Sequence, residues 1–333
     1  MIKNSWYAIL ASDKIKKNEV TGVKRCGIYL ALFRDDKGEL HCVQDLCAHR
    51  GAALSKGRVN DGCIQCPFHG IKYDKDGKCV FVPSDGLASE ASYDRFNLKH
   101  YHIREINEIV YFWYGEGEPD REPDTFKEIE GMDYHEISDH WKTHYSRIIE
   151  NQLDVSHLPF VHHNTIGKGG KTLVNGPKVV WLDDNTLQTS ADNEVDHGQK
   201  KNSPENAKIK STNLTFKFPN QWLNTISPEK LYIFAYFVPV DDKNAIICLR
   251  FYNKFTPFSW LNRLIAPFGS IANKIVESQD KRVVQTQYPK KSGLRVGENL
   301  VQADRPIIEY RKHRDKLQKE AEEEEKEKTE EPE

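Results

Sequence analysis

Two short segments of the chain each combine one cysteine with one histidine. The first carries Cys47 and His49 and the second carries Cys66 and His69, with sixteen residues between His49 and Cys66. Two thiolates and two imidazoles are the ligand set of a Rieske [2Fe-2S] cluster, in which the thiolates bind one iron and the imidazoles bind the other. The spacing therefore predicts an electron-carrying iron–sulfur site, held by two loops at one tip of an N-terminal domain.

Other cysteine chemistry fits these residues less well. Zinc frameworks usually pair Cys-x2-Cys with His-x3–5-His, whereas here each segment supplies one ligand of each type. Cys63 and Cys66 form a Cys-x2-Cys pair, but the residues around it lack the strand and helix of a thioredoxin-like dithiol. Gly51 and Gly70 suit loops that bend tightly around a cluster. The residues favour iron–sulfur over zinc.

A second group of candidate ligands lies later in the chain. On an α-helix, Glu150, Asp154 and His157 are related by i, i+4 and i+7 and share one face. His162 would point away from that face on an unbroken helix, but Pro159 interrupts the helix and allows His162 to return. Two imidazoles with one carboxylate from elsewhere form the facial triad of a non-haem Fe(II) oxygenase. The alternative is an amphipathic helix whose histidines are ordinary core or surface groups.

The cysteine and histidine segments resemble those of a known family. Cys47-Ala48-His49-Arg50-Gly51 and Cys66-Pro67-Phe68-His69-Gly70 are similar to the two cluster-binding boxes of the Rieske non-haem iron oxygenases, the ring-hydroxylating oxygenase alpha-subunit family. The resemblance extends from Trp6 to about Arg311. Respiratory and photosynthetic Rieske proteins carry a disulfide between the two loops, but this chain has Ala52 and Phe68 at those positions. The resemblance implies that the cluster is held by Cys47, His49, Cys66 and His69.

The second group is similar to the signature Asn-x2-Asp-x2-His-x4-His of the same family. The matching residues are Asn151, Asp154, His157 and His162. The resemblance implies that the two histidines bind a mononuclear non-haem Fe(II), whereas Asp154 connects this iron to the Rieske histidine of a neighbouring subunit. An amide three residues before the aspartate resembles the monooxygenase and demethylase branch. The ring dihydroxylases place it one residue earlier, where this chain has Glu150.

A third iron ligand has to come from a distant carboxylate. The pattern of apolar residues predicts a helix over residues 272–287. Within it, the segment from Asp280 to Gln287 resembles the closing segment of the family, with the acid first and a glutamine seven residues later. Glu277 lies one turn earlier and is the rival ligand. The resemblance favours Asp280.

The resemblance also implies a function and partners. It implies a terminal oxygenase component, expected to be a monooxygenase, that uses O2 to hydroxylate or oxidatively demethylate a small-molecule substrate. Electrons would come from an NAD(P)H-dependent reductase, directly or through a ferredoxin. A homotrimer is expected, in which His69 and Asp154 join the two metal sites across a subunit boundary. The alternatives are a Rieske electron-transfer protein with an inert C-terminal module and a zinc protein without redox chemistry.

The substrate is less well defined by the sequence. Aromatic and polar residues on the expected strands suit the wall of a pocket for a mainly apolar or aromatic molecule, although they fit an ordinary core equally well. These residues are Asn213, Phe216, Trp222, Phe234 and Tyr236.

Composition limits the class of protein further. Lys and Arg total 48 against 50 Asp and Glu, and the resulting net charge of −2 argues against a nucleic-acid binder. Five cysteines remain beside the two cluster ligands, an odd number that fits reduced thiols in the cytoplasm. The N-terminal residues lack the apolar core of a signal peptide. The most apolar stretch, residues 255–276, has the composition to skim a membrane, but a buried helix–turn–helix is the simpler interpretation.

The order of the predicted elements gives an α+β fold with two domains. Residues 1–115 are expected to form an all-β Rieske domain, since short β-rich runs alternate there with Gly and Asp turns. The family resemblance implies that residues 116–312 form a helix-grip catalytic domain, an antiparallel sheet around a C-terminal helix, and the order of the predicted elements agrees with it. Residues 191–211 are polar and suit a long hairpin loop or a flap. Residues 313–333 are nearly all charged and are expected to be a disordered tail.

Overall fold

The chain divides into two compact units in the computed structural model, which describes residues 1–330. One unit comprises Asn4–Pro123, and the other comprises Met1–Lys3 together with the chain from Asp124 onward. The first is built of β-strands, and the second combines a large antiparallel sheet with helices. The predicted α+β class, with an all-β domain before a sheet-and-helix domain, is confirmed.

The boundary between the units lies a few residues after the expected position at residue 115. The indole N–H of Trp6 donates a hydrogen bond of 2.6 Å to the carbonyl of Arg121, and the Arg121 guanidinium lies 5.9 Å from the centre of the Trp113 ring. These contacts tie the Gly- and Pro-containing segment after residue 115 to the first unit. The composition of this segment is that of a linker. Composition does not reveal that Trp6 and Trp113 hold the segment against the first unit.

Three small antiparallel sheets make up the first unit. Their strand orders are β1-β10-β9, β2-β3-β4 and β5-β6-β7-β8. The strands are β1 (Ser5–Ala11), β2 (Val20–Arg25), β3 (Ile28–Arg34), β4 (Leu40–Gln44), β5 (Arg58–Asn60), β6 (Cys63–Gln65), β7 (Lys72–Tyr73), β8 (Cys79–Phe81), β9 (Ile103–Ile106) and β10 (Ile109–Tyr114). The loops after β4 and β6 carry the two cysteine–histidine segments.

A seven-stranded antiparallel sheet forms the centre of the second unit, in the order β11-β17-β16-β15-β14-β13-β12. The strands are β11 (Asp133–Trp141), β12 (Leu173–Asp183), β13 (Thr186–Glu194), β14 (Asn213–Lys217), β15 (Gln221–Ser227), β16 (Leu231–Pro239) and β17 (Ala245–Asn253). The polar segment between β13 and β14, which pair as neighbours, is the expected long hairpin loop. The strongly apolar strands β16 and β17 lie in the interior of this sheet and are buried over most of their length.

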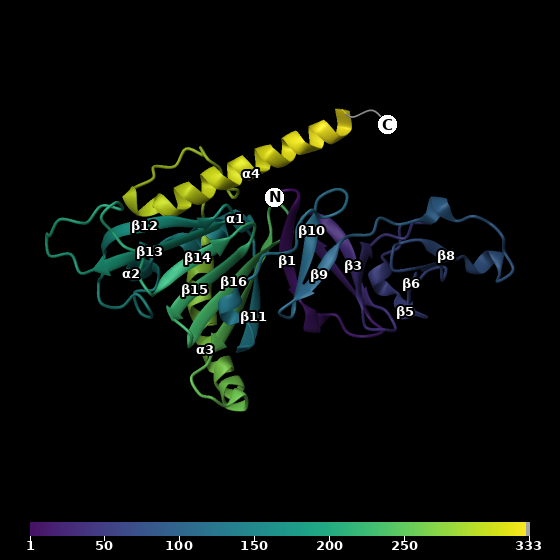
Figure 1. The fold of residues 1–333 in the computed structure, drawn as a ribbon, viewed down its shortest axis with the longest axis horizontal. Coiled ribbons are helices and arrows are strands. Elements are labelled where there is room, and N and C mark those ends of the chain that lie inside the picture. Colours follow the sequence, from purple (N-terminus) through teal and green to yellow (C-terminus); the bar gives the residue numbers. More distant parts are fainter. Residues whose placement is uncertain (331–333) are drawn as a thin grey trace. The chain divides into compact units, whose positions relative to one another are not determined.

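Within the described residues, four α-helices accompany the large sheet. They are α1 (Tyr145–Leu153), α2 (Leu158–Val161), α3 (Ser259–Val284) and α4 (Arg305–Glu330). Helix α3 packs against β11 and β17, α1 packs against β16, and α4 lies along β12 (Figure 1). This is the expected helix-grip arrangement, and it brings α1, α2 and α3 together at one side of the sheet.

Two helices end or begin at other residues than the sequence predicts. Helix α1 stops at Leu153, because the carboxylate of Asp154 accepts hydrogen bonds of 2.6 and 2.7 Å from the backbone N–H and hydroxyl of Ser156 and turns the chain. Pro159 does not make the break. It lies in the first turn of α2, where a helix needs no N–H from it. The prediction of one helix from Glu150 through His157 is therefore wrong.

Helix α3 is longer than predicted and replaces the expected helix–turn–helix over residues 255–276. Pro267 and Gly269 both lie inside it. Gly269 is required there, because a Cβ at this position would lie 2.5 Å from ring atoms of Phe251 on the sheet. The glycine therefore serves close packing of helix against strand and does not end the helix.

The expected disordered tail from residue 313 is also wrong for the described residues, which continue α4 to Glu330. The helix starts on buried side chains, Ile307 and Tyr310, and these anchor its first turns. Its charged part consists of strong helix formers with i,i+4 ion pairs such as Lys319–Asp315 at 2.8 Å. Residues 331–333 of the expected tail lie outside the described residues.

Candidate metal centres

The two cysteine–histidine loops of the first unit have the same backbone geometry. In each loop the cysteine carbonyl accepts a hydrogen bond from the residue four positions later, and the cysteine N–H donates to the carbonyl five positions later, at 2.8–3.1 Å. The partners are Gly51 and Ala52 for Cys47, and Gly70 and Ile71 for Cys66. Both glycines have φ near +70°, which favours glycine over other residues. The sequence thus folds into two matching loops that present a cysteine and a histidine each.

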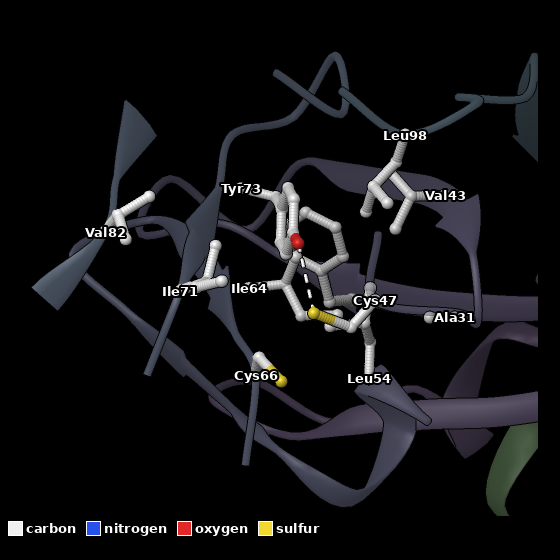
Figure 2. Close-up of a cluster of buried hydrophobic side chains, with 11 residues drawn as sticks. Ala31, Val43, Cys47, Leu54, Ile64, Cys66, Ile71, Tyr73, Val82 and Leu98 are labelled. Atoms are coloured by element: carbon white, nitrogen blue, oxygen red, sulfur yellow. Dashed lines mark hydrogen bonds between the residues drawn. The ribbon is translucent and has the colours of Figure 1, made fainter. Parts of the chain in front are cut away.

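The cysteines and histidines of these loops differ in exposure. Cys47 and Cys66 are each 2% exposed and belong to an apolar cluster with Leu54, Ile64 and Ile71 (Figure 2). His49 and His69 are exposed, and their ring centres lie 4.6 Å apart. A group bound by all four residues would have a buried thiolate side and an imidazole side that faces out of the unit.

Hydrogen-bond donors surround the cysteine sulfurs. The hydroxyl of Tyr73 lies 3.1 Å from the Cys47 sulfur (Figure 2). Burial raises the pKa of the Cys66 thiol, whereas the backbone N–H groups of Phe68 and His69 act in the opposite direction by hydrogen bonding to its sulfur. Donors aimed at cysteine sulfur stabilise the negative charge of a bound iron–sulfur cluster. The four residues therefore fit a Rieske cluster, and no disulfide joins any of the seven cysteines.

In the second unit, the structure brings His157, His162 and Asp280 together. Oδ1 of Asp280 lies 3.0 Å from Nε2 of His162 and 3.4 Å from Nε2 of His157. One ligand atom from each residue lies within 4.8 Å of the others. The histidines come from the two ends of α2 and the carboxylate from α3. Two imidazole nitrogens and one carboxylate oxygen that converge in a partly buried site fit a divalent metal with open positions.

The charge around His157 favours a cation at this site. Its Nδ1 lies 3.6 Å from the Asp154 carboxylate, and its Nε2 faces Asp280. Burial alone would lower the pKa of His157, but the carboxylates of Asp154 and Asp280 outweigh it and raise the pKa to about 9. Asp154 itself has a lowered pKa: burial acts against this, and the contacts with His157 and Ser156 outweigh the burial.

A hydrogen-bond chain that the sequence does not indicate fixes the ring of His162. Its Nδ1 lies 2.8 Å from Oε1 of Gln279, which also accepts from the Thr165 hydroxyl at 2.9 Å. Such a partner sets which ring nitrogen carries the proton and leaves Nε2 free to bind a metal. Gln279 directly precedes Asp280 on α3, but nothing in the sequence distinguishes it from a surface glutamine.

Glu277, the rival carboxylate, is turned towards other partners. It accepts a hydrogen bond from the indole N–H of Trp141, and it lies beside Asp139. Burial and then the Asp139 carboxylate raise the pKa of Glu277 to about 7. It is not a member of the three-residue group that Asp280 completes.

Glu150 and Asn151 lie on different sides of α1. Glu150 is buried and accepts hydrogen bonds of 2.7 and 2.9 Å from Arg311 of α4, so it joins two helices. Asn151 lines the cavity beside the three-residue group, and its buried Nδ2 has no hydrogen-bond partner within residues 1–330. The amide is thus placed to contact a molecule in that cavity.

The cavity next to the three-residue group has a volume of about 300 Å³. Its wall is mainly apolar and comes from α3 and strands β14 to β17: Leu214, Trp222, Ile226, Ile233, Leu249, Phe251, Ala272 and Val276. Of the residues expected on the wall, Trp222 is found there. Phe234 and Tyr236 point to the opposite face of the sheet, because they alternate with Ile233 on β16. For these two residues, the alternative of an ordinary core is correct.

Two family models match the chain, one on each unit. Residues 5–92 match the Rieske [2Fe-2S] domain, and residues 141–320 match the vanillate O-demethylase oxygenase C-terminal domain. The chain therefore belongs to the Rieske oxygenases of the vanillate O-demethylase family. The family resemblance of its sequence motifs is confirmed.

Curated relatives match about half of this chain. It is 32% identical to chlorophyllide a oxygenase of Chlamydomonas reinhardtii over 50% of this chain and 26% of that protein. It is 28% identical to the oxygenase component of chloroacetanilide N-alkylformylase of Rhizorhabdus wittichii over 57% of this chain and 54% of that protein. The matches thus span between about a quarter and about half of these relatives' length.

Solved structures resemble the fold over nearly the whole chain. NdmA of Pseudomonas putida CBB5 matches with a TM-score of 0.77 at 20% identity, covering 96% of this chain and 92% of that one. Dicamba monooxygenase matches with a TM-score of 0.74 at 18% identity, covering 96% of this chain and 98% of that one. Both likenesses support the arrangement of strands and helices within each unit.

Proposed function

We propose that this protein is the terminal oxygenase component of a multi-component system and that it hydroxylates or oxidatively demethylates a small, mainly apolar substrate. The convergence of His157, His162 and Asp280 beside an apolar cavity carries this proposal. Iron held by these residues would supply O2 activation, because three protein ligands do not fill its coordination sphere. A structural zinc site would instead be closed by four protein ligands.

The first unit would supply electrons. Cys47 and Cys66 would hold one iron of a Rieske cluster, and His49 and His69 would hold the other. The exposed ring of Phe68 lies 4.0 Å from the ring of His69, centre to centre, and it offers apolar surface for contact with a protein partner. We propose that an NAD(P)H-dependent reductase, directly or through a ferredoxin, delivers single electrons to this tip.

Electrons would leave the cluster through His69 and reach the iron of a neighbouring subunit through Asp154, in a homotrimer. Asp154 is suited to this task because it contacts His157 without joining the three-residue group. Its carboxylate orients that imidazole and keeps a negative charge beside it. Asn151 would contact the substrate through its unpartnered amide.

The names of relatives support a substrate built on a ring. Dicamba monooxygenase has been solved with dicamba and NdmA with caffeine, and other relatives are named for chlorophyllide a and cholesterol. A cavity of about 300 Å³ with Trp222, Phe251 and few charged residues suits a compact ring system. We expect either hydroxylation of such a ring or removal of a methyl group attached to it.

Metal analysis and single-turnover chemistry test the proposal. The purified protein should contain labile sulfide and three irons per chain, and its reduced form should give the EPR signal of a Rieske cluster. With a surrogate reductase and a panel of ring compounds, product should form only when O2 is present. Zinc without labile sulfide would refute the proposal. A normal Rieske signal with no iron at His157 and His162 would favour the alternative of an electron-transfer protein with an inert second unit.

A further inference from the structure

Helix α3 has its large apolar side chains on the side that faces away from the protein. Its residues Trp260, Leu264, Phe268, Ile271 and Ile275 follow one another at spacings of four, four, three and four, so they share one face. They are between 51% and 74% exposed. We call these five residues the outer stripe.

The opposite face of α3 is small or polar and is buried. Asn262, Ala266 and Ser270 lie there, at most 3% exposed, and Gly269 packs beneath the ring of Phe251. A surface helix of a globular protein normally shows the reverse arrangement, with its apolar stripe against the core. The composition of α3 therefore indicates that its outer side contacts apolar groups outside this chain.

The loop before α3 extends the apolar surface. Phe255 and Phe258 are 49% and 58% exposed and directly precede Trp260. The first turns of α3 project beyond the strands of the large sheet (Figure 1). Aromatic side chains on a projecting helix end are suited to insertion into the headgroup region of a lipid bilayer.

The charges of this segment have one sign. Lys254, Arg263 and Lys274 are its charged residues, and no acid occurs between Lys254 and Val276. Asp133 of β11 pairs with Arg263 at 2.7 Å, whereas Lys254 and Lys274 have no ion-pair partner among the described residues. The turn between β15 and β16, next to Lys254, adds one acid and one base, Glu229 and Lys230. The stripe is thus flanked by positive charge.

This charge pattern selects the kind of partner. Two copies of the stripe in contact would place lysine against lysine or arginine, with no acid on the segment to separate them. The phosphate groups of an anionic bilayer would attract the same lysines while the acyl chains receive the aromatic and aliphatic side chains. No helix within residues 1–330 is long and apolar enough to cross a membrane, so α3 would lie in the plane of the surface.

We propose that the outer stripe, with Phe255 and Phe258, docks this protein on the surface of an anionic phospholipid membrane. The stripe lies next to the mouth of the cavity: Ala272 lines the cavity and is also exposed, and it is one turn from both Phe268 and Ile275. Ile166 and Ile226, exposed residues of the cavity wall, continue the apolar rim. With the protein docked in this way, an apolar substrate dissolved in the bilayer would reach the cavity directly. This part of the inference rests on the proposed oxygenase function.

Vesicle flotation of the intact protein tests the docking. The protein should float with vesicles of phosphatidylcholine mixed with phosphatidylglycerol and float less with phosphatidylcholine alone or at high salt. The triple variant Trp260→Gln, Leu264→Gln, Phe268→Gln should bind the anionic vesicles on the order of tenfold less. A matched triple at exposed positions elsewhere, Tyr29→Gln, Leu87→Gln, Leu182→Gln, should bind like the unaltered protein.

A charge variant at exposed positions provides a second test. Lys254→Glu with Lys274→Glu should weaken binding to anionic vesicles, whereas Lys37→Glu with Lys75→Glu should not. Flotation that is equal for the unaltered protein and both test variants, or absent for all, overturns the docking surface. The docking surface is also overturned if the Trp260 triple variant, measured without lipid, has a different oligomeric mass from the unaltered protein. The stripe would then be a subunit contact. None of these readouts uses turnover, so their failure leaves the oxygenase proposal standing.

Discussion

The carboxylate of Asp280 lies 3.0 Å from Nε2 of His162, whereas Glu277, one turn earlier on the same helix, hydrogen-bonds to Trp141. Two acids of similar sequence context therefore have different surroundings. The geometry favours Asp280 as the third ligand of the mononuclear iron, and the two acids can be compared directly by substitution.

Replacing Asp280 by Ala should remove the mononuclear iron and abolish turnover, because a site with two imidazoles alone holds divalent iron weakly. The EPR signal of the Rieske cluster should be unchanged, since the cluster ligands belong to another unit. Iron analysis before and after the change measures the loss of one iron per chain. Glu277→Gln is the matched control and should retain that iron. The reverse result for the two variants would reassign the ligand.

The hydroxyl of Tyr73, 3.1 Å from the Cys47 sulfur, should raise the reduction potential of the cluster. In Tyr73→Phe the cluster should remain but its potential should fall by on the order of 40 mV, the equivalent of one hydrogen bond of about 1 kcal/mol in a one-electron couple. Redox titration followed by EPR gives the value. Tyr93→Phe is the control, because the Tyr93 hydroxyl bonds to Asp85 and Ser89 and not to a cysteine. An unchanged potential in Tyr73→Phe would show that this hydroxyl has no effect on the cluster.

Arg311 connects α4 to α1 through Glu150 and also pairs with Glu298 at 2.7 Å. Arg311→Met should destabilise the second unit by about 2–3 kcal/mol, since Glu150 and Glu298 then keep only Arg147 as a cationic partner. Thermal unfolding measures the loss. Lys319→Met on the same helix removes an exposed pair with Asp315, which solvent screens, and should lower the melting temperature much less. Equal effects of the two changes would mean that α4 is not held at Glu150.

Glu277 should make stability depend on pH near neutrality. Burial and the Asp139 carboxylate raise its pKa from 4.5 to about 7. Between these values the folded protein binds more protons than the unfolded chain, so the stability contribution of Glu277 falls as the pH rises. Glu277→Gln removes that penalty, and its melting temperature relative to the unaltered protein should increase by on the order of 5 °C from about pH 5 to about pH 8.

For Glu298, the dependence of stability on pH should have the opposite sign, so this residue serves as the comparison. Burial acts to raise its pKa, but the guanidinium groups of Arg311 and Arg147 outweigh the burial and lower it. Its contribution is present above its ordinary pKa and is lost as the pH falls through the lowered value. The stability that Glu298→Gln loses relative to the unaltered protein should therefore become smaller as the pH falls. Parallel pH profiles for the two variants would contradict both assignments.

The sequence predicts the strands, and the grouping of the candidate ligand residues, better than it predicts the helices. Cysteines, histidines and acids at fixed spacing are recognisable because metal chemistry restricts the residue types. The ends of α1 and α3 depend instead on contacts between distant residues, such as the packing of Gly269 against Phe251. Periodicity shows that Trp260 and Leu264 share a face of α3, but it does not show whether that face points towards the sheet. For the same reason, Gln279 was not recognisable as the partner of His162.

Asp154 is the residue at which the proposed metal chemistry and the proposed trimer can be tested together. Its carboxylate lies 3.6 Å from Nδ1 of His157 and accepts two hydrogen bonds from Ser156, and it does not belong to the three-residue group. Asp154→Asn should therefore retain the cluster and the mononuclear iron at nearly normal occupancy. An amide has the shape of the carboxylate but is a weaker acceptor and carries no charge, so transfer of electrons between the two sites should fail.

Single-turnover measurements separate this effect from a loss of structure. The cluster of Asp154→Asn should be reducible by dithionite, but it should stay reduced when substrate and O2 are added, and product should fall by on the order of 100-fold. Ser156→Ala removes only the hydroxyl that orients Asp154 and should reduce the rate by a smaller factor. Mixed trimers, in which one subunit type lacks the His69 ligand and the other lacks Asp154, should recover part of the activity if electrons cross between neighbours. Normal reoxidation of the cluster in Asp154→Asn, or full activity of a monomer, would refute the route between subunits.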